Sequence, residues 1–174
     1  MTSRETDEFD ALRATIRERG TARVYVFAGG IAGWAALTIA TAALASTPVA
    51  SLLPLLVLAS VFEAVFALHV GVERIGRYLQ VFHETDGGWE QAAMAFGRPA
   101  GAVTTDALFT VPFLVAALFN LAPALILDPA RVELIFVGGA HALFVLRLLV
   151  ARHAAGRQRA IDLKRFEELR DRQA

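Results

Sequence analysis

The sequence has no cysteine, and only one of its 17 basic residues, Lys164, is a lysine. The absence of cysteine excludes disulfides, thiol catalysis, iron–sulfur ligation and thiolate zinc sites. The other basic residues are arginines, and alanine is abundant among the apolar residues. This composition is typical of a GC-rich bacterial genome, so we expect a bacterial protein.

Charged residues are missing from two long stretches of the 174-residue chain. No charge occurs between residues 24 and 62, or between residues 107 and 127. The chain is 56% hydrophobic and has a mean hydropathy of +0.50, whereas an ordinary soluble domain is about half apolar. Uncharged runs of this length exclude an ordinary globular domain and favour membrane-spanning helices.

The pattern predicts an all-α polytopic membrane protein with four transmembrane helices. The expected spans are residues 24–45, 48–72, 107–127 and 130–150. Each span reaches roughly 30 Å at ~1.5 Å per residue, which is the thickness of a bilayer core. Thr47 before Pro48 and Asp128 before Pro129 are predicted to cap spans two and four, because proline is favoured in the first helical turn.

Cytoplasmic segments are expected beside the four-helix bundle of residues 21–150. Residues 1–20 are predicted to form an amphipathic helix that ends at Gly20. The connection at about residues 85–105 is expected to lie in the cytoplasm or at the membrane interface. Spans two and four are expected to continue as helices beyond the membrane, the latter through residues 151–174.

The basic residues are distributed unevenly over the two sides of the predicted spans. Five fall before residue 24, three between residues 73 and 106, and eight from Arg147 onward, while the two remaining loops share only Arg131. This positive-inside bias places both termini in the cytoplasm and the chain in the cell inner membrane. The two external loops are then too short to hold a catalytic domain.

Two titratable residues are predicted to meet inside the membrane. Glu63 in span two and His141 in span four lie at similar depths, and the two spans run in the same direction. Charged groups at such a depth are costly and usually have a partner. The pair is therefore either a proton- or ion-binding site of a small transporter or channel, or a hydrogen bond that fixes helix packing.

The densest polar cluster beside a span consists of Glu73, Arg74 and Arg77. Glu73 and Arg77 are spaced i, i+4 in the favourable order for an ion pair. Arg147, near the end of span four, is expected to pair with Glu73 or to extend to the cytoplasmic surface. These four residues are candidate contacts for an anion or an anionic lipid headgroup, the alternative being a positive-inside anchor with local salt bridges.

Two short glycine motifs lie within the predicted spans. Gly29 and Gly33 form a G-x-x-x-G pattern in span one, and Gly138 and Gly139 are adjacent in span four. Small residues let helices approach closely in a membrane. The motifs fit packing inside the chain and fit an interface with another helix equally well.

Catalytic motifs are absent from the sequence. It contains no glycine-rich phosphate loop, no H-E-x-x-H and no E-x-x-H pattern. We therefore expect neither an enzyme nor a metal site. No cofactor is predicted, and haem b is the one alternative, because His69, His83, His141 and His153 lie on two predicted helices. No histidine pair from the two helices shares a depth inside the bilayer, which argues against haem.

The leading interpretation is a small interaction or accessory subunit of the inner membrane, either homo-oligomeric or part of a larger complex. The glycine-rich faces, the long helical extensions and the missing catalytic constellation favour this class. The expected partners are membrane lipids and either the chain itself or other membrane proteins. Nucleic acid is not expected, because the basic C-terminal tail lacks interleaved aromatic residues.

Overall fold

Five α-helices and one short 3₁₀-helix make up the computed structural model, which describes residues 3–84, 87–96 and 105–172. The elements are α1 (Ser3–Leu44), η1 (Pro48–Ser51), α2 (Leu52–Phe82), α3 (Trp89–Phe96), α4 (Thr105–Ile126) and α5 (Arg131–Asp171). No strand occurs within these described ranges, so the predicted all-helical architecture is confirmed for them.

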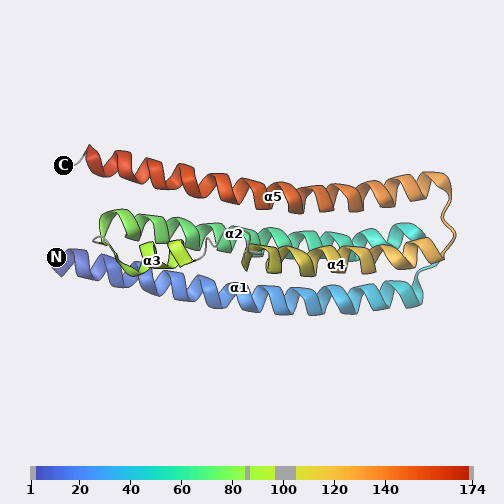
Figure 1. Ribbon diagram of the computed structural model, residues 1–174. Helices are drawn as coiled ribbons and strands as arrows, with labels where there is room; N and C mark the ends of the chain where they lie inside the picture. The colour runs from blue at the N-terminus through green and yellow to red at the C-terminus, as the bar shows by residue number, and fades with distance from the viewer. Residues whose placement is uncertain (1–2, 85–86, 97–104, 173–174) are drawn as a thin grey trace.

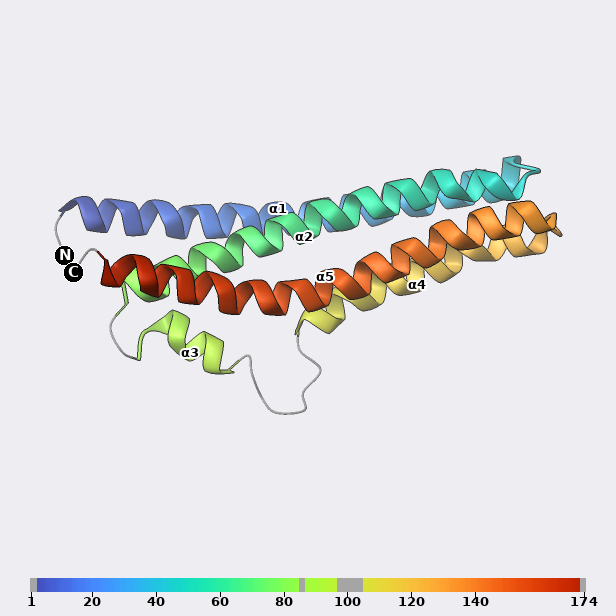
Figure 2. The same cartoon turned by 90° about the horizontal axis from the view of Figure 1, so that it is seen from above.

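The long helices lie side by side in an elongated bundle (Figures 1 and 2). α1, α2 and α5 run along most of its length, and the start of α1 and the end of α5 lie at the same end (Figure 1). α4 accompanies them only in the half near the α1–α2 turn, while the short α3 lies beside the other half (Figure 2). The molecule therefore has a four-helix half and a half into which α1, α2 and α5 extend.

Three helical segments of the described chain are long and apolar enough to cross a membrane: α1, Pro48–Phe82 and α5. α4 supplies a shorter apolar helix, Thr110–Ile126. Large apolar side chains are exposed along these helices, among them Leu118 and Leu143, each 69% exposed. Soluble monomers seldom present apolar surface of this extent.

The break predicted at Gly20 is absent, because α1 continues without interruption from Ser3 to Leu44. A glycine typically ends a helix by taking a left-handed conformation. Gly87 is the only glycine with a positive φ among the described residues. α1 packs against α2, and this contact offsets the ~1 kcal/mol that a glycine costs inside a helix. The predicted amphipathic helix and span one are thus a single element.

The N-terminal ends of η1 and α5 are capped in different ways. Thr47 has an extended backbone before Pro48, as predicted for an N-cap, but its side chain makes no capping hydrogen bond. The cap predicted at Asp128 is wrong, because Asp128 is left-handed with a φ of 50° and Ala130 is the N-cap. The carboxylate of Glu133 accepts a hydrogen bond from the Ala130 N–H at 3.0 Å. Glu133 therefore satisfies this helix start.

Aromatic rings fill the core of the four-helix half. Phe62 of α2 meets Phe113 of α4 and Phe144 of α5 edge to face, with ring centroids 5.2 and 6.2 Å apart. Phe27 of α1 meets Phe113 in the same way at 5.8 Å. Edge-to-face contact is a favoured arrangement of aromatic pairs, so these rings join all four helices in one core.

Candidate functional site

Glu63 of α2 and Arg147 of α5 form a two-point ion pair. Arg147 donates from Nε to Oε1 of Glu63 and from Nη2 to Oε2, both at 2.7 Å. Its guanidinium also lies over the rings of Phe62 and Phe66, 5.9 and 5.4 Å from their centroids. The Glu63 side chain is 48% exposed and the Arg147 side chain 42%. The pair has the bidentate geometry of a strong ion pair, yet it lies on the outside of the bundle.

An apolar hollow runs beside this ion pair on the outer side of α2 and α5. Its volume is about 490 Å³. It is open to the outside and most of its lining is aliphatic. We call the surface formed by this hollow and the ion pair the α2/α5 face; its residues are Leu52, Leu56, Ala59, Glu63, Ala140, Leu143 and Arg147.

A second polar cluster is buried where α1, η1, α4 and α5 meet. The side chain of Asn120 is fully buried, and its Oδ1 accepts hydrogen bonds from Trp34 Nε1 at 3.2 Å and Thr38 Oγ1 at 3.4 Å. Its Nδ2 donates to the backbone carbonyl of Ser51 at 2.8 Å and to Nε2 of His141 at 3.0 Å. All four hydrogen-bonding positions of the amide are thus used inside the chain.

This network holds His141 in one tautomer. Nε2 of His141 faces the amide N–H of Asn120, so it accepts that hydrogen bond. Nδ1 carries the proton and donates to the carbonyl of Val137 at 2.8 Å. A buried polar side chain is stable when its groups are paired in this way, and the arrangement serves helix packing.

The predicted pairing of Glu63 with His141 is wrong. Glu63 faces Arg147 on the outside of the bundle, whereas His141 contacts Asn120 in its interior. The spacing of His141 and Arg147 on α5 separates them by about 120° around the helix. Arg147, the partner of Glu63, lies six residues or about 9 Å from His141 along α5, so Glu63 and His141 differ in level as well as in direction.

The polar cluster of α2 connects this helix to α5. Glu73 accepts a hydrogen bond from Arg77 Nη2 at 3.3 Å, which is the predicted i, i+4 pair, and pairs with Arg159 Nε at 2.6 Å. Arg74 pairs with Asp162 at 3.2 Å. Arg77 is only 4% exposed. These ion pairs hold the extensions of α2 and α5 together.

The structure does not bring the four candidate anion contacts into one site. Arg147 is paired with Glu63, so its predicted pairing with Glu73 is wrong. Arg77 is buried against Glu73, which leaves Arg74 as the exposed cation of the cluster, with 54% of its side-chain surface accessible. The arrangement is that of a contact between helices, and it is not an open anion site.

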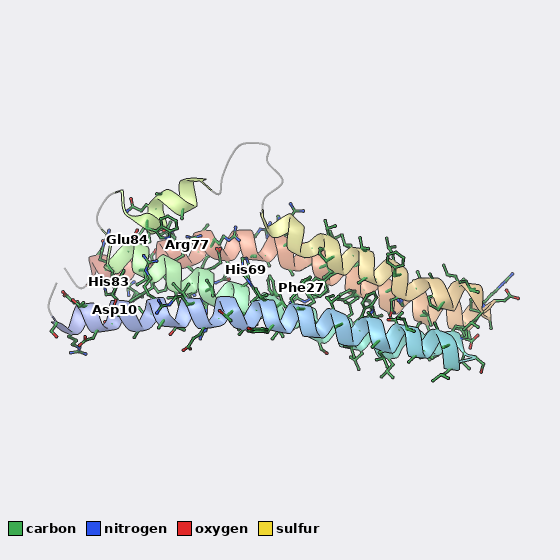
Figure 3. The ribbon with its side chains drawn as sticks, turned by 90° about the horizontal axis from the view of Figure 1, so that it is seen from below. Asp10, Phe27, His69, Arg77, His83 and Glu84 are labelled. Carbon is green, nitrogen blue, oxygen red and sulfur yellow. The ribbon has the colours of Figure 1, made fainter. Side chains whose placement is uncertain are left out.

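Two of the four histidines, His69 and His83, lie on α2 and at its C-terminal cap, respectively. His69 lies between Arg23 and Arg159, whose nearest guanidinium nitrogens are 3.1 Å from Nδ1 and 3.3 Å from Nε2. His83 lies further along α2, beyond Arg77 (Figure 3), and packs against aromatic rings. Both ring nitrogens of His69 and of His141 already contact other groups, which argues against these two histidines as haem ligands. Within the described ranges no three metal-ligating side chains converge.

Tyr78 connects the beginning of α1 to α2. Its hydroxyl donates to Oε1 of Glu8 at 2.7 Å, and its ring packs on Phe82 and Phe166. The hydrogen bond to Glu8, followed by burial, raises the pKa of Tyr78 above its ordinary value. The hydroxyl therefore stays protonated at neutral pH and keeps donating to Glu8.

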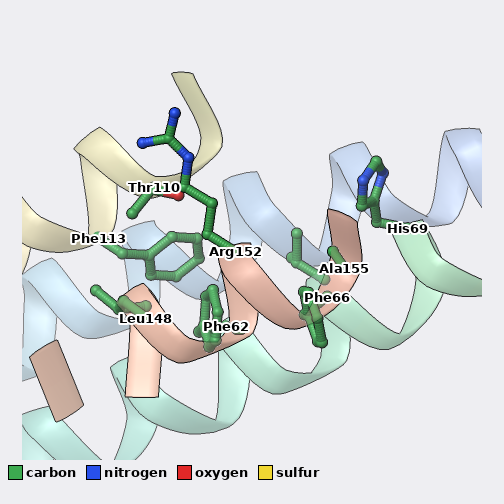
Figure 4. Close-up of a pocket in the computed structure, with 10 residues that line it drawn as sticks. Phe62, Phe66, His69, Thr110, Phe113, Leu148, Arg152 and Ala155 are labelled. Carbon is green, nitrogen blue, oxygen red and sulfur yellow. The ribbon is translucent and has the colours of Figure 1, made fainter. Parts of the chain in front are cut away.

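A small cavity of about 40 Å³ lies between α2, α4 and α5 (Figure 4). Phe62, Phe66 and Phe113 line it, with Thr110 and Arg152 at its edge. Its volume is far below the roughly 300 Å³ at which ligand pockets begin. The cavity is therefore too small to hold a cofactor.

Comparison with protein families, with curated proteins and with solved structures finds no match. Two features were missed by sequence reasoning: the Asn120 network and the partner of Glu63. Asn120 is the one amide side chain in the uncharged run 107–127, which is the signal that could have selected it.

Proposed function

We propose that this chain is an interaction subunit of a bacterial inner membrane, with four membrane spans, that acts by contacting membrane proteins and performs no catalysis. The observation that carries the proposal is the Glu63–Arg147 ion pair. It lies half-exposed at the edge of an apolar hollow, on helices that are long and apolar enough to cross a bilayer.

The proposed membrane boundaries follow from the charges that bracket the apolar helices. On α5, Arg131 and Arg152 lie roughly 30 Å apart at ~1.5 Å per residue, which matches a hydrocarbon core. Arg23 of α1 contacts His69 of α2, so both residues are placed at the cytoplasmic boundary of the proposed hydrocarbon core. Arg147 then lies about 8 Å inside the hydrocarbon region.

A charge pair at this depth is unfavourable when it faces lipid. Moving a charged side chain into the membrane costs several kcal/mol, so such residues almost always face protein or water. The two-point contact cancels the net charge of Glu63 and Arg147, but about half of each side chain stays uncovered. A helix of another protein molecule on the α2/α5 face would remove this exposure.

The glycines predicted at packing positions support association between molecules. Inside the chain, the close α1–α2 contact is at Gly30, where an added Cβ would lie 2.4 Å from Val61. The predicted glycines, in contrast, have no atom within 4 Å of an added Cβ: Gly29, Gly33, Gly138 and Gly139. Their surfaces are open to neighbouring helices, and small residues favour such contacts in membranes.

The transport alternative has no such support from the geometry. It was predicted from a Glu63–His141 pair, and Glu63 instead forms its ion pair with Arg147. Both ring nitrogens of His141 form hydrogen bonds, one with Asn120 and one with Val137. These contacts favour a role in a surface ion pair for Glu63 and a role in helix packing for His141.

The proposed orientation predicts a labelling pattern. Because the chain has no cysteine, single cysteines can be introduced without background. We expect Thr47→Cys and Ala130→Cys to react with a membrane-impermeant thiol reagent in intact cells, and Gln91→Cys to react only after permeabilisation, since basic segments stay inside. The reverse pattern would contradict the proposed orientation.

Photocrosslinking tests the interaction function directly. A benzophenone attached to Leu143→Cys, on the α2/α5 face, is expected to form a protein adduct of defined mass in native membranes. The same probe on Leu118→Cys is the matched control, because Leu118 is equally exposed on α4 but lies outside the face. Adducts with lipid alone from Leu143→Cys would exclude the proposed function.

A further inference from the structure

We infer that the molecule covering the α2/α5 face is a second copy of this chain, related to the first by a two-fold axis along the membrane normal. This inference rests on the proposed function, because it names the partner in that contact. Three properties of the face carry it: the unused hydrogen-bonding capacity of the ion pair, the symmetry of its charges, and the shape of the hollow beside it.

The ion pair retains capacity for a second set of hydrogen bonds. A guanidinium has five N–H donors, and each carboxylate oxygen has two acceptor positions. Arg147 uses one N–H on Nε and one on Nη2 toward Glu63, and each Glu63 oxygen accepts one of them. Further donors and acceptors remain beside each other on a half-exposed surface. The best partner supplies both an anion and a cation at this depth.

A second copy supplies both charges by symmetry. Two chains inserted in the same orientation are related by an axis along the membrane normal, so equivalent residues lie at equal depth. In an isologous contact each residue pairs with its complement on the other copy. Glu63 of one copy then faces Arg147 of the other and vice versa, which closes a ring of four alternating charges. A different protein would need both charges at this same depth.

The shape of the face fits the same arrangement. Leu56 and Leu143 are among the residues that line the hollow, and they are 64% and 69% exposed. Ala59 and Ala140 line the hollow with small side chains, and small residues allow helices to approach closely in a membrane. In a two-fold contact the leucines of one copy enter the hollow of the other. The α2/α5 face of each copy thus presents both the exposed leucines and the hollow that receives the leucines of the other copy.

A lipid is a poorer occupant of the face than a second chain. An acyl chain would cover Leu56 and Leu143 but carries no group that binds an ion pair. Phospholipid headgroups lie at the membrane boundary, which is about 8 Å from Arg147 along α5. The polar part of the face would therefore stay uncovered, and a second chain covers both parts.

Disulfide crosslinking in membranes tests the dimer. With Leu143→Cys as the only cysteine, mild oxidation is expected to produce a crosslinked dimer in high yield, because the two-fold axis passes close to this residue. Leu118→Cys is the control on α4 and is expected to stay monomeric. Equal yields from the two positions would mean random collision and would overturn the inference.

A charge exchange tests the symmetric ring itself. The double variant Glu63→Arg/Arg147→Glu keeps an ion pair within each copy and, in a dimer of two variant copies, keeps the alternating ring. In a mixed dimer with an unexchanged copy, like charges face each other. With Leu143→Cys in both copies and different tags, crosslinks in mixed pairs are expected to fall roughly tenfold or more below matched pairs, the equivalent of about 1.4 kcal/mol.

Equal crosslinking of mixed and matched pairs would overturn the inference. Should the exchanged variant fail to accumulate, native mass spectrometry of the unaltered chain in lipid nanodiscs decides, and the mass of two chains is the expected result. A single-chain mass combined with a photo-adduct to another protein at Leu143→Cys overturns the dimer and leaves the proposed function standing. A single-chain mass with lipid adducts alone overturns both.

Discussion

Replacing Asn120 by leucine is expected to cause the largest loss of stability of any single substitution described here. Leucine has a similar size, but it leaves the indole N–H of Trp34, the carbonyl of Ser51 and Nε2 of His141 without the partners they have now. A stranded buried polar group costs about 1–3 kcal/mol, and single hydrogen bonds in membrane proteins average about 0.6 kcal/mol. We therefore expect a loss of roughly 2–5 kcal/mol in the free energy of unfolding.

Thermal unfolding in mild detergent, followed by circular dichroism, measures this loss. Phe119→Leu is the matched control, because Phe119 is the neighbour of Asn120 on α4 and is 66% exposed. The control is expected to unfold at nearly the temperature of the parent chain. An Asn120→Leu variant that unfolds together with the control would show that the amide network contributes little.

The second large effect is expected from removing Arg147 alone. Arg147→Leu leaves the carboxylate of Glu63 without its two-point partner on an apolar surface, and an unpaired charge within a membrane span costs about 2–4 kcal/mol. The double variant Glu63→Gln/Arg147→Leu removes the stranded charge. Its stability is therefore expected to recover most of this loss.

The two variants separate stability from association. Unfolding temperatures are expected to rank the double variant close to the parent chain and Arg147→Leu well below both. Crosslinking through Leu143→Cys is expected to stay low in both variants, because neither can form the ring of alternating charges. A double variant that is no more stable than Arg147→Leu would show that the carboxylate of Glu63 does not depend on Arg147 for its stability.

The sequence predicted neither the level nor the direction of the Glu63 side chain relative to His141. Hydropathy and charge predicted similar levels for Glu63 and His141 on parallel helices, but Glu63 meets α5 at Arg147, about 9 Å along the helix from His141. The direction of a side chain around its helix depends on how the helix rotates against its neighbours, and packing of Phe62, Phe113 and Phe144 decides this rotation. The same rotation turns Arg147 outward onto Glu63.

Among the local signals, the side-chain pairing within one helix was reliable and the signals for helix ends were not. The i, i+4 pair of Glu73 and Arg77 forms as predicted, because both residues belong to one rigid helix. The breaker signal at Gly20 failed, and on either side of Gly20 the helix contacts α2, through Arg19 beside Gly71 and Arg23 beside His69. The cap at Asp128 failed because Glu133 competes for the helix start from inside α5.

The glycine motifs illustrate a different gap between sequence and structure. A G-x-x-x-G spacing says that two glycines share one side of a helix, but it does not say whether that side faces the same chain. In α1 the intrachain contact uses Gly30, while Gly29 and Gly33 point to open space. Gly29 and Gly30 are adjacent on α1, so the rotation of the helix about its axis decides which of them faces α2. This rotation is set by the packing of the helices in the bundle.

The uninterrupted course of α5 gives the molecule a mechanical property. α5 is continuous from Arg131 to Asp171, with no break between its apolar half and its charged half, so a tilt of one half is expected to carry the other half with it. The part beyond Arg152 is roughly 29 Å long, so a tilt of about 10° at Arg152 would move its tip by about 5 Å. Ion pairs with Glu73 and Arg74 transmit that swing to α2. A change of packing among the apolar helices is therefore amplified into a displacement at the far end of the bundle.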